Sequence, residues 1–236
     1  RPVVGARLTV DFQKEGGLRV ANGDIRHLDD DMVSLQLPQA TLLDSDCFTD
    51  LPRSLTTLSL PKFDAQVSAN DVQQLPRTLR ILDLPSQQSF STDCVLALPP
   101  QLETLILLKN REFTNTSLNI LPKTLTVLDL NSNDKVDGYS FSNLPPLLRY
   151  LSLNSAVNVN ALQISALPKT MRRLELRKAA LGDDSVEKLG AMQELQYLDI
   201  SSAKLSTNCI RQCPRDLKVL MAPLSSWTGA AASIAL

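Results

Sequence analysis

The chain has 236 residues, of which 43% are hydrophobic and 21% are charged, and its formal net charge at pH 7 is −1. This is the composition of an ordinary globular protein, and no apolar run approaches the ~20 residues of a membrane-spanning helix. Because the net charge gives no general attraction for nucleic acid or anionic lipid, we expect neither a nucleic-acid partner nor a membrane partner. No basic start followed by an apolar stretch indicates a signal peptide.

One phrase recurs along most of the chain and is clearest at Leu121–Leu130, where it reads Leu-Pro-Lys-Thr-Leu-Thr-Val-Leu-Asp-Leu. The first leucine of each closing Leu-x-Leu is a phase marker. These markers follow one another at steps of 22 to 24 residues, and they are Leu35, Leu58, Leu82, Leu105, Leu128, Leu151, Leu174, Leu198 and Leu220. An earlier marker, Leu8, lies 27 residues upstream of the first of them. Self-similarity at a period of about 20 to 50 residues is typical of stacked repeat proteins.

Each unit predicts the same succession of elements. The alternating leucines predict a short strand with the leucines on its inner face. A helix-capping residue then begins a short helix or 3₁₀ turn, and these residues are Asp44, Ser68, Ser91, Thr114, Asp137, Asn160, Gly182 and Ser206. The Leu-Pro that follows ends the helix, because proline lacks a backbone donor and biases the preceding residue away from helix. We therefore expect about ten strands in one unbroken array.

The array predicts a single domain over 1–236, because no linker or composition shift divides it. The domain comprises an atypical N-terminal repeat at 1–34, regular repeats at 35–221, and a C-terminal cap or tail at 222–236. Terminal repeats must cover the open edge of the core. We expect the single tryptophan, Trp227, to pack over the last repeat, and a role as a partner anchor is the alternative. Because the chain does not begin with Met, we expect a fragment or processed form of a longer chain, or a subunit of a larger assembly.

The repeated Leu-x-x-Leu-x-Leu pattern resembles the leucine-rich-repeat superfamily over essentially the whole chain. Its Leu-Pro-x-x-Leu start is similar to the proline-led repeats of some bacterial effectors and protist proteins. The resemblance implies an α/β solenoid shaped as a curved horseshoe. About ten parallel strands would line its concave face, and short helices or 3₁₀ turns its convex face. The family's usual asparagine after the strand is matched only by Asn110 and Asn133, so we do not expect a regular asparagine ladder.

No pattern of residues predicts an active site. Cys47 and Cys94 stand two repeats apart, about 10 Å if strands are about 4.8 Å apart, which exceeds the Cα separation of a disulfide. Reduced cysteines predict an intracellular, cytoplasmic protein, whereas the sequon Asn115-Thr116-Ser117 points to an extracellular one. His27 has no nucleophile beside it in a motif, and the aspartates at 29–31 predict a solvated turn rather than a calcium site. We therefore expect no catalytic, metal or cofactor site and no enzymatic activity.

The register also predicts which side chains face outward on the concave face, where the resemblance implies that binding often occurs. In mid-array, Ile106, Leu108, Val127 and Tyr150 would form an exposed apolar patch. Beside this patch stand aromatic and charged residues, which are Arg173, Glu175, Arg177, Tyr197 and Asp199. Ser152 is also expected to be exposed on this face.

These outward residues favour a binding role. Tyrosine and arginine are enriched at the energetic hot spots of protein interfaces, and exposed apolar patches often mark contact sites. High β-propensity alone is the competing explanation for Ile, Val and Tyr on a strand surface. The leading hypothesis is a non-enzymatic module or scaffold that binds a protein partner. The alternative is the substrate-recognition part of a larger enzyme system, such as a ubiquitin ligase. It rests on residues 181–186 and 195–200, which look more like the cysteine-containing repeat subtype associated with such ligases.

Overall fold

The computed structural model describes residues 9–11, 20–37, 42–85, 87–154, 159–179, 181–206 and 209–222. In these residues ten strands of three residues each form one parallel sheet, and the strand order follows the chain from β1 to β10. The strands are β1 Thr9–Asp11, β2 Ser34–Gln36, β3 Thr57–Ser59, β4 Ile81–Asp83, β5 Thr104–Ile106, β6 Val127–Asp129, β7 Tyr150–Ser152, β8 Arg173–Glu175, β9 Tyr197–Asp199 and β10 Val219–Met221. The predicted parallel array is confirmed.

The pairing register is the one that the marker leucines predict from β2 onward. Leu35 pairs with Leu58 at one end of this series, and Leu198 pairs with Leu220 at the other. In β1 the residue that pairs with Leu35 is Val10. The choice of Leu8 as the first marker is therefore wrong by two residues, and Leu8 itself lies outside the described residues. The repeat pattern alone could not separate these two positions, because side chains alternate along a strand with a period of two.

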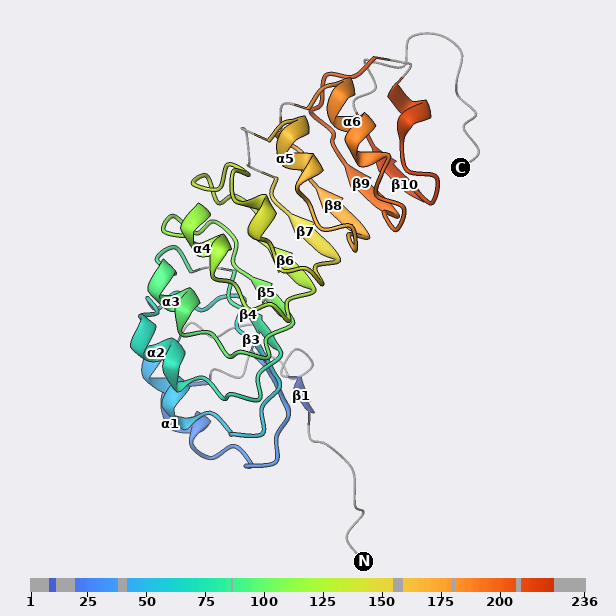
Figure 1. The fold of residues 1–236 in the computed structure, drawn as a ribbon. Helices are drawn as coiled ribbons and strands as arrows, with labels where there is room; N and C mark the ends of the chain where they lie inside the picture. Colours follow the sequence, from blue (N-terminus) through green and yellow to red (C-terminus); the bar gives the residue numbers. More distant parts are fainter. Residues whose placement is uncertain are drawn as a thin grey trace, which may run out of the picture.

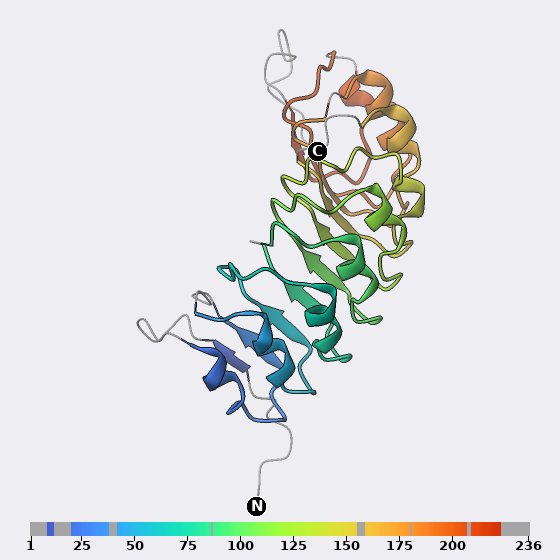
Figure 2. The same cartoon turned by 90° about the vertical axis from the view of Figure 1, so that its left-hand side faces the viewer.

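Short helices line the side of the array opposite the sheet. Figures 1 and 2 show the strands along the inner side of a gentle arc and the helices along its outer side. The helices are α1 Asn22–Ile25, α2 Ala69–Gln74, α3 Thr92–Leu96, α4 Asn115–Asn119, α5 Ala161–Ser165 and α6 Asp183–Leu189, and the 3₁₀ helices are η1 Ser45–Asp50, η2 Phe141–Asn143 and η3 Cys209–Gln212. This agrees with the predicted horseshoe of strands and short helices.

Most of the helices begin at the residue that the sequence predicts as their N-cap. Ser68 accepts a hydrogen bond from the backbone N–H of Asp71, and Asp71 accepts one in return from the N–H of Ser68. Residues that match the prediction also cap η1, α3, α4, α5 and α6. The prediction is wrong for Asp137, because η2 takes Ser140 as its N-cap. Gly138 lies between them with a φ of 85°, a left-handed turn that delays the helix.

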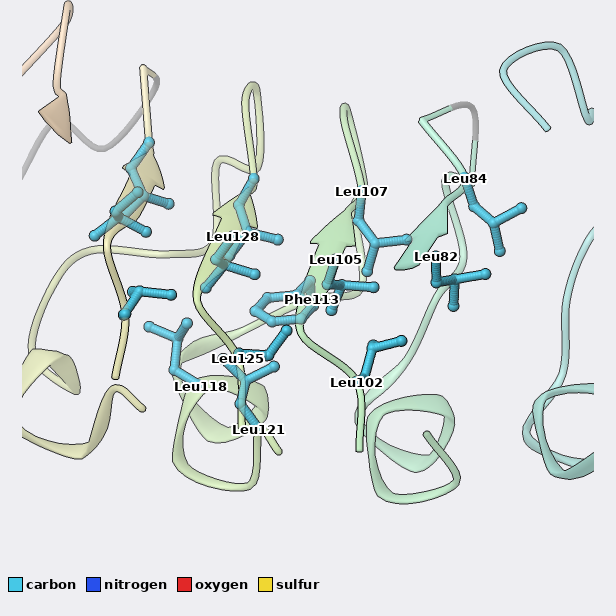
Figure 3. Close-up of a cluster of buried hydrophobic side chains, with 14 of the residues drawn as sticks. Leu82, Leu84, Leu102, Leu105, Leu107, Phe113, Leu118, Leu121, Leu125 and Leu128 are labelled. Carbon is cyan, nitrogen blue, oxygen red and sulfur yellow. The ribbon is translucent and has the colours of Figure 1, made fainter. Parts of the chain in front are cut away.

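The inward side chains fill a continuous apolar column between the sheet and the helices. All marker leucines from Leu35 to Leu198 are 0% exposed. Figure 3 shows the ring of Phe113 among the leucines of neighbouring repeats, and four further phenylalanines are equally buried: Phe48, Phe63, Phe90 and Phe141. Leu220 on β10 is only partly buried, and among the described residues this strand pairs with β9 alone.

Hydroxyl groups tie the turn before many strands to the preceding repeat. The Thr78 hydroxyl lies 2.8 Å and 2.7 Å from the carbonyl oxygens of Arg53 and Leu55, one repeat earlier. Ser54, Thr124 and Thr170 reach two carbonyl oxygens in the same way. We call these contacts hydroxyl hooks. They account for the Ser or Thr that follows Leu-Pro-x in four of the repeats, because the single proton of a hydroxyl there can be shared between backbone carbonyls of the repeat before. In other repeats this place holds Gln101, Leu147 or Asp216.

Side-chain amides extend the stacking beyond the sheet. Gln87 Nε2 donates to the carbonyl oxygens of Phe63 and Ala65, and Asn110 Nδ2 donates to that of Gln87. Asn133 Nδ2 donates to the carbonyl of Leu107, while its Oδ1 has no partner among the described residues. Gln87 thus bonds to the repeat before it as Asn110 does, at the place in its repeat that the two asparagines hold in theirs.

We expect Leu128→Ala to lower the free energy of unfolding by about 2–5 kcal/mol, because it leaves a cavity in the packed column. Leu162→Ala is a matched control, since Leu162 is 72% exposed on α5 and surface substitutions usually stay within about 0.5 kcal/mol. Urea denaturation of both variants measures the difference. Equal losses would contradict the inward assignment of the marker leucines.

Thr124→Val should lower the free energy of unfolding by about 1 kcal/mol, because it deletes one hydroxyl hook at nearly constant volume. Thr116→Val makes the same chemical change at an exposed position of α4 and should have little effect. The two denaturation midpoints are compared under identical conditions. A Thr124 variant as stable as the Thr116 variant would show that the hooks do not stabilise the array.

Candidate protein-binding surface

Strands β5 to β9 bring the predicted site residues together on the concave face. The register places Val127, Tyr150, Arg173 and Tyr197 side by side on four consecutive strands. Arg173 and Arg177 are exposed, whereas Val127, Tyr150 and Tyr197 are half-buried. We call the outward residues of these five strands, with Leu108 and Arg177 just beyond the strand ends, the concave surface.

The guanidinium of Arg173 lies between two tyrosine rings. Its Cζ is 5.3 Å from the ring centroid of Tyr150 and 4.1 Å from that of Tyr197, within the range of cation–π attraction. Its Nε and one terminal nitrogen donate to the same oxygen of Glu175 at 2.8 Å and 2.6 Å. This hydrogen bonding further raises the pKa of Arg173. The stack therefore holds a permanent cation in one orientation, with half of its side chain open to solvent.

Glu175 and Asp199 are not exposed, contrary to the prediction. They are 4% and 1% exposed, because longer arginine side chains from the same sheet lie over them. Arg173 covers Glu175, and Arg177 Nε lies 2.7 Å from Asp199 Oδ2. Ser201 also donates to Asp199 through its backbone N–H at 3.3 Å. The arginines are consequently the accessible groups, and the carboxylates beneath them fix their positions.

A row of polar groups continues from these carboxylates into the neighbouring strands. Ser152 was also expected to be exposed but is fully buried, and its hydroxyl lies 3.4 Å from Glu175 Oε2. Asp129 accepts hydrogen bonds from the N–H of Asn131 at 3.1 Å and from the Tyr150 hydroxyl at 3.4 Å. Burial raises the pKa of Asp129, and it raises the pKa of Tyr150 to about 12. Tyr150 is therefore a neutral donor held in place at both its ring and its hydroxyl.

The apolar part of the concave surface is less exposed than predicted, and it extends further. Ile106, Leu108 and Val127 are half-buried. Ile81 on β4 is 36% exposed and was not predicted as a site residue, although it occupies the same outward position of its strand. Asp83 pairs with Ile106 across the sheet and accepts a hydrogen bond from the Ser59 hydroxyl at 2.6 Å. Burial raises the pKa of Asp83.

A cavity of ≈ 560 Å³ opens at the edge where β5 and β6 end. Lys109, Arg111 and Lys135 contribute cations to its lining, and Asp134 contributes a carboxylate. Lys135 also pairs with Glu112 at 3.4 Å. Sequence reasoning did not find this cavity, because apart from Asn110 its residues lie at loop positions that the repeat pattern does not define.

The titratable groups outside the concave surface form no reactive constellation in the part of the chain that the structure describes. No three His, Cys, Asp or Glu side chains there could together hold a metal ion. All four cysteines are free, and burial raises the pKa of Cys47 to about 12 and that of Cys209 to about 11. Such thiols stay protonated and are poor nucleophiles. His27 is exposed on the turn after α1.

No helix in the described residues combines the length and the apolar character that crossing a bilayer requires.

Comparisons with known proteins place the chain by its fold. No protein-family model matches the sequence, and no curated protein matches it. Solved structures do match. A leucine-rich-repeat protein of Leptospira interrogans shares 18% identity with a TM-score of 0.60, over 89% of this chain and 54% of that one. The Rad7 and Elc1 complex of yeast gives 16% identity and a TM-score of 0.58, over 85% and 66% respectively.

An internalin of Listeria monocytogenes gives 16% identity and a TM-score of 0.57, over 81% of this chain and 61% of that one. The chain thus spans less than two thirds of the length of each of these three structures. At such low identity the likeness concerns the fold. Together with the ten-stranded parallel array and its buried leucine column, it shows that the chain has the fold of the leucine-rich-repeat superfamily, as its repeated motif predicts.

Proposed function

We propose that this chain is a non-enzymatic protein-interaction module whose concave surface binds a protein partner. The Tyr150–Arg173–Tyr197 stack is the observation that carries this proposal. It presents two aromatic rings and a guanidinium, the side chains most enriched at interface hot spots. The half-buried Ile106, Leu108 and Val127 lie next to it on β5 and β6 and would supply the apolar part of the contact.

The energetics of the stack support a binding role over a purely structural one. Burying Glu175 and Asp199 removes two carboxylates from water, and pairing them with arginines only offsets that cost. Apolar side chains of similar size usually give a fold that is equally or more stable. High β-propensity accounts for Val, Ile and Tyr on a strand, but it does not account for arginines fixed over buried acids.

The stack is also held in place before any partner arrives. Arg173 is restrained by two rings and one carboxylate, and Tyr150 by its hydroxyl contact with Asp129. Side chains that are already ordered lose little conformational entropy on binding, which favours affinity. In this proposal Arg173, Arg177, Tyr150 and Tyr197 touch the partner, whereas Glu175 and Asp199 act by positioning the arginines.

The alternative function is recognition of a substrate for a larger enzyme system, such as a ubiquitin ligase. One observation favours it: the yeast structure that this fold matches is of Rad7 in complex with Elc1. The two functions share the same surface. They are distinguished by the proteins recovered with the chain, since an enzyme component should accompany the partner only under the alternative.

We expect Tyr150→Ala combined with Tyr197→Ala to weaken partner binding at least about 30-fold, because a hot-spot side chain contributes about 2 kcal/mol or more. Arg173 and Glu175 remain paired in this variant. A partner recovered by affinity purification with the unaltered chain is purified, and its dissociation constant is measured by calorimetry.

Tyr139→Ala is the matched control, since Tyr139 is 73% exposed in the loop before η2. It should leave the dissociation constant unchanged. Equal affinities for the double variant and the control would rule out the stack as the binding site.

Arg173→Ala should lower the free energy of unfolding by about 1–3 kcal/mol, because it leaves the buried Glu175 without its cation. Adding Glu175→Gln should restore most of this loss. Urea denaturation of the single and double variants measures both effects. If Arg173→Ala is as stable as the unaltered chain, the Arg173–Glu175 pair is dispensable to the fold. Any loss of partner binding by this variant would then not be due to instability.

A further inference from the structure

Positive charge gathers along one edge of the solenoid, although the net charge of the whole chain is −1. The turns that lead from the helices into β3 to β10 lie side by side along this edge (Figure 2). In order they are 52–56, 76–80, 99–103, 122–126, 145–149, 168–172, 192–196 and 214–218. Nine exposed cations stand there against three carboxylates. We call these turns the basic rim.

Four cations of the basic rim follow a longer period than the fold does. Arg77, Lys123, Lys169 and Arg215 stand at the same place in their repeats and are 46 residues apart, which is two repeats. Arg53 holds this place in the repeat directly before Arg77, where it donates to the carbonyl of Gln74 at 3.2 Å. Prolines hold this place in two of the repeats between them, at Pro100 and Pro146. Because neighbouring strands are about 4.8 Å apart, the four cations form a single file at intervals of about 9.6 Å.

These four cations are available to a partner. All of them are exposed, and none makes an ion pair with another described residue. The Lys123 ammonium donates to the carbonyl of Asn143 at 3.3 Å, which leaves other donors of that group free. By contrast, Arg80 and Arg172 in the same rim pair with Glu103 and Glu194.

The backbone that carries the cations is fixed. Thr78, Thr124 and Thr170 directly follow three of them, and each makes a hydroxyl hook to the repeat before. The hooks occupy carbonyl oxygens of the rim, so the cationic side chains are the main groups that it offers outward. The turn before β2 carries Asp29, Asp30 and Asp31 instead, which ends the positive row at β3.

We propose that the basic rim binds an extended acidic segment of a protein, with Asp or Glu at every third residue. A polyproline-II chain rises about 3.1 Å per residue with three residues per turn, so every third side chain faces the same way at intervals of about 9.3 Å. This matches the spacing of the cation file. Two of the four cations are arginines, whose planar fork suits a carboxylate.

Other polyanions fit the rim less well. Single-stranded nucleic acid is usually held by bases stacked on aromatic rings, and the eight turns contain no Phe, Tyr or Trp. A bilayer would meet a narrow edge of turns, with cations and carboxylates mixed, instead of a broad basic face. Leu147, 53% exposed, is the apolar residue most open to it in these turns. This site is separate from the concave surface, so the inference does not rest on the proposed function.

The test measures binding of a labelled twelve-residue peptide with Glu at every third position by fluorescence anisotropy. The variant Arg77→Gln/Lys123→Gln/Lys169→Gln/Arg215→Gln should bind it at least about tenfold more weakly than the unaltered chain. The control variant replaces four exposed cations outside the rim with Gln, which removes the same charge and the same residue types; they are Arg111, Lys178, Lys204 and Arg211. It should lose much less affinity.

Two further comparisons decide the geometry. A peptide of equal composition with its four Glu residues contiguous should bind more weakly than the spaced peptide. The paired variants Arg77→Gln/Lys123→Gln and Lys169→Gln/Arg215→Gln should each lose part of the affinity, and they serve if the fourfold variant does not fold. Tyr150→Ala combined with Tyr197→Ala should bind the spaced peptide normally, which separates this site from the concave surface.

Three outcomes would overturn the proposal. Equal losses in the fourfold variant and its control would show attraction by net charge alone. Equal binding of the two peptides would remove the spacing argument. Binding of single-stranded oligonucleotide or of phosphatidylserine vesicles that depends on the four cations, without binding of the spaced peptide, would assign the rim to a different polyanion.

Discussion

Each repeat of this chain buries its leucines only against the repeats on either side of it, and the whole structure depends on that lateral stacking. Strands of three residues make too few hydrogen bonds to stand alone. Pairing Leu105 with Leu128, and each marker with the next, turns separate short strands into one core. The register cannot slip by one residue without exposing every leucine of a strand.

The same constraint creates the surfaces. Because repeats stack in register, any position of the repeat becomes a column along the molecule, and its members touch even when they are far apart in sequence. Arg173 meets Tyr150 and Tyr197 because all three hold the first position of their strands. The cations of the basic rim are aligned for the same reason. The core fixes the geometry of these columns, and the choice of residue in each repeat determines their chemistry.

The residues that recur in every repeat made the core predictable, because a buried position admits little besides a large apolar side chain. They could not predict the exposure of outward residues. Glu175 and Asp199 occupy outward positions but are covered by the longer Arg173 and Arg177, and such cover depends on the length and charge of neighbours. Ser152 is buried for the same reason, between residues of adjoining strands.

Other differences arise where the repeat is irregular or where its period is longer than the fold's. Gly138 shifts a helix start from the place that Asp137 predicts, and a two-residue offset in β1 leaves the alternation unchanged. The alternation of Lys or Arg with proline in the rim is visible in the letters. A search for residues that every repeat shares does not find it, because from Arg77 onward the cation recurs at every second repeat.

The hydroxyl hooks and the amide ladder have a direction. The later repeat always supplies the donor, as Thr78 does to Leu55 and Asn110 does to Gln87, and the earlier repeat supplies only a backbone oxygen. A ribosome makes the N-terminal repeats first. Each repeat therefore leaves the exit tunnel with its backbone carbonyl oxygens available as acceptors. The hydroxyl and amide side chains that donate to them follow about one repeat later. The order of synthesis and the order in which these bonds can close are the same.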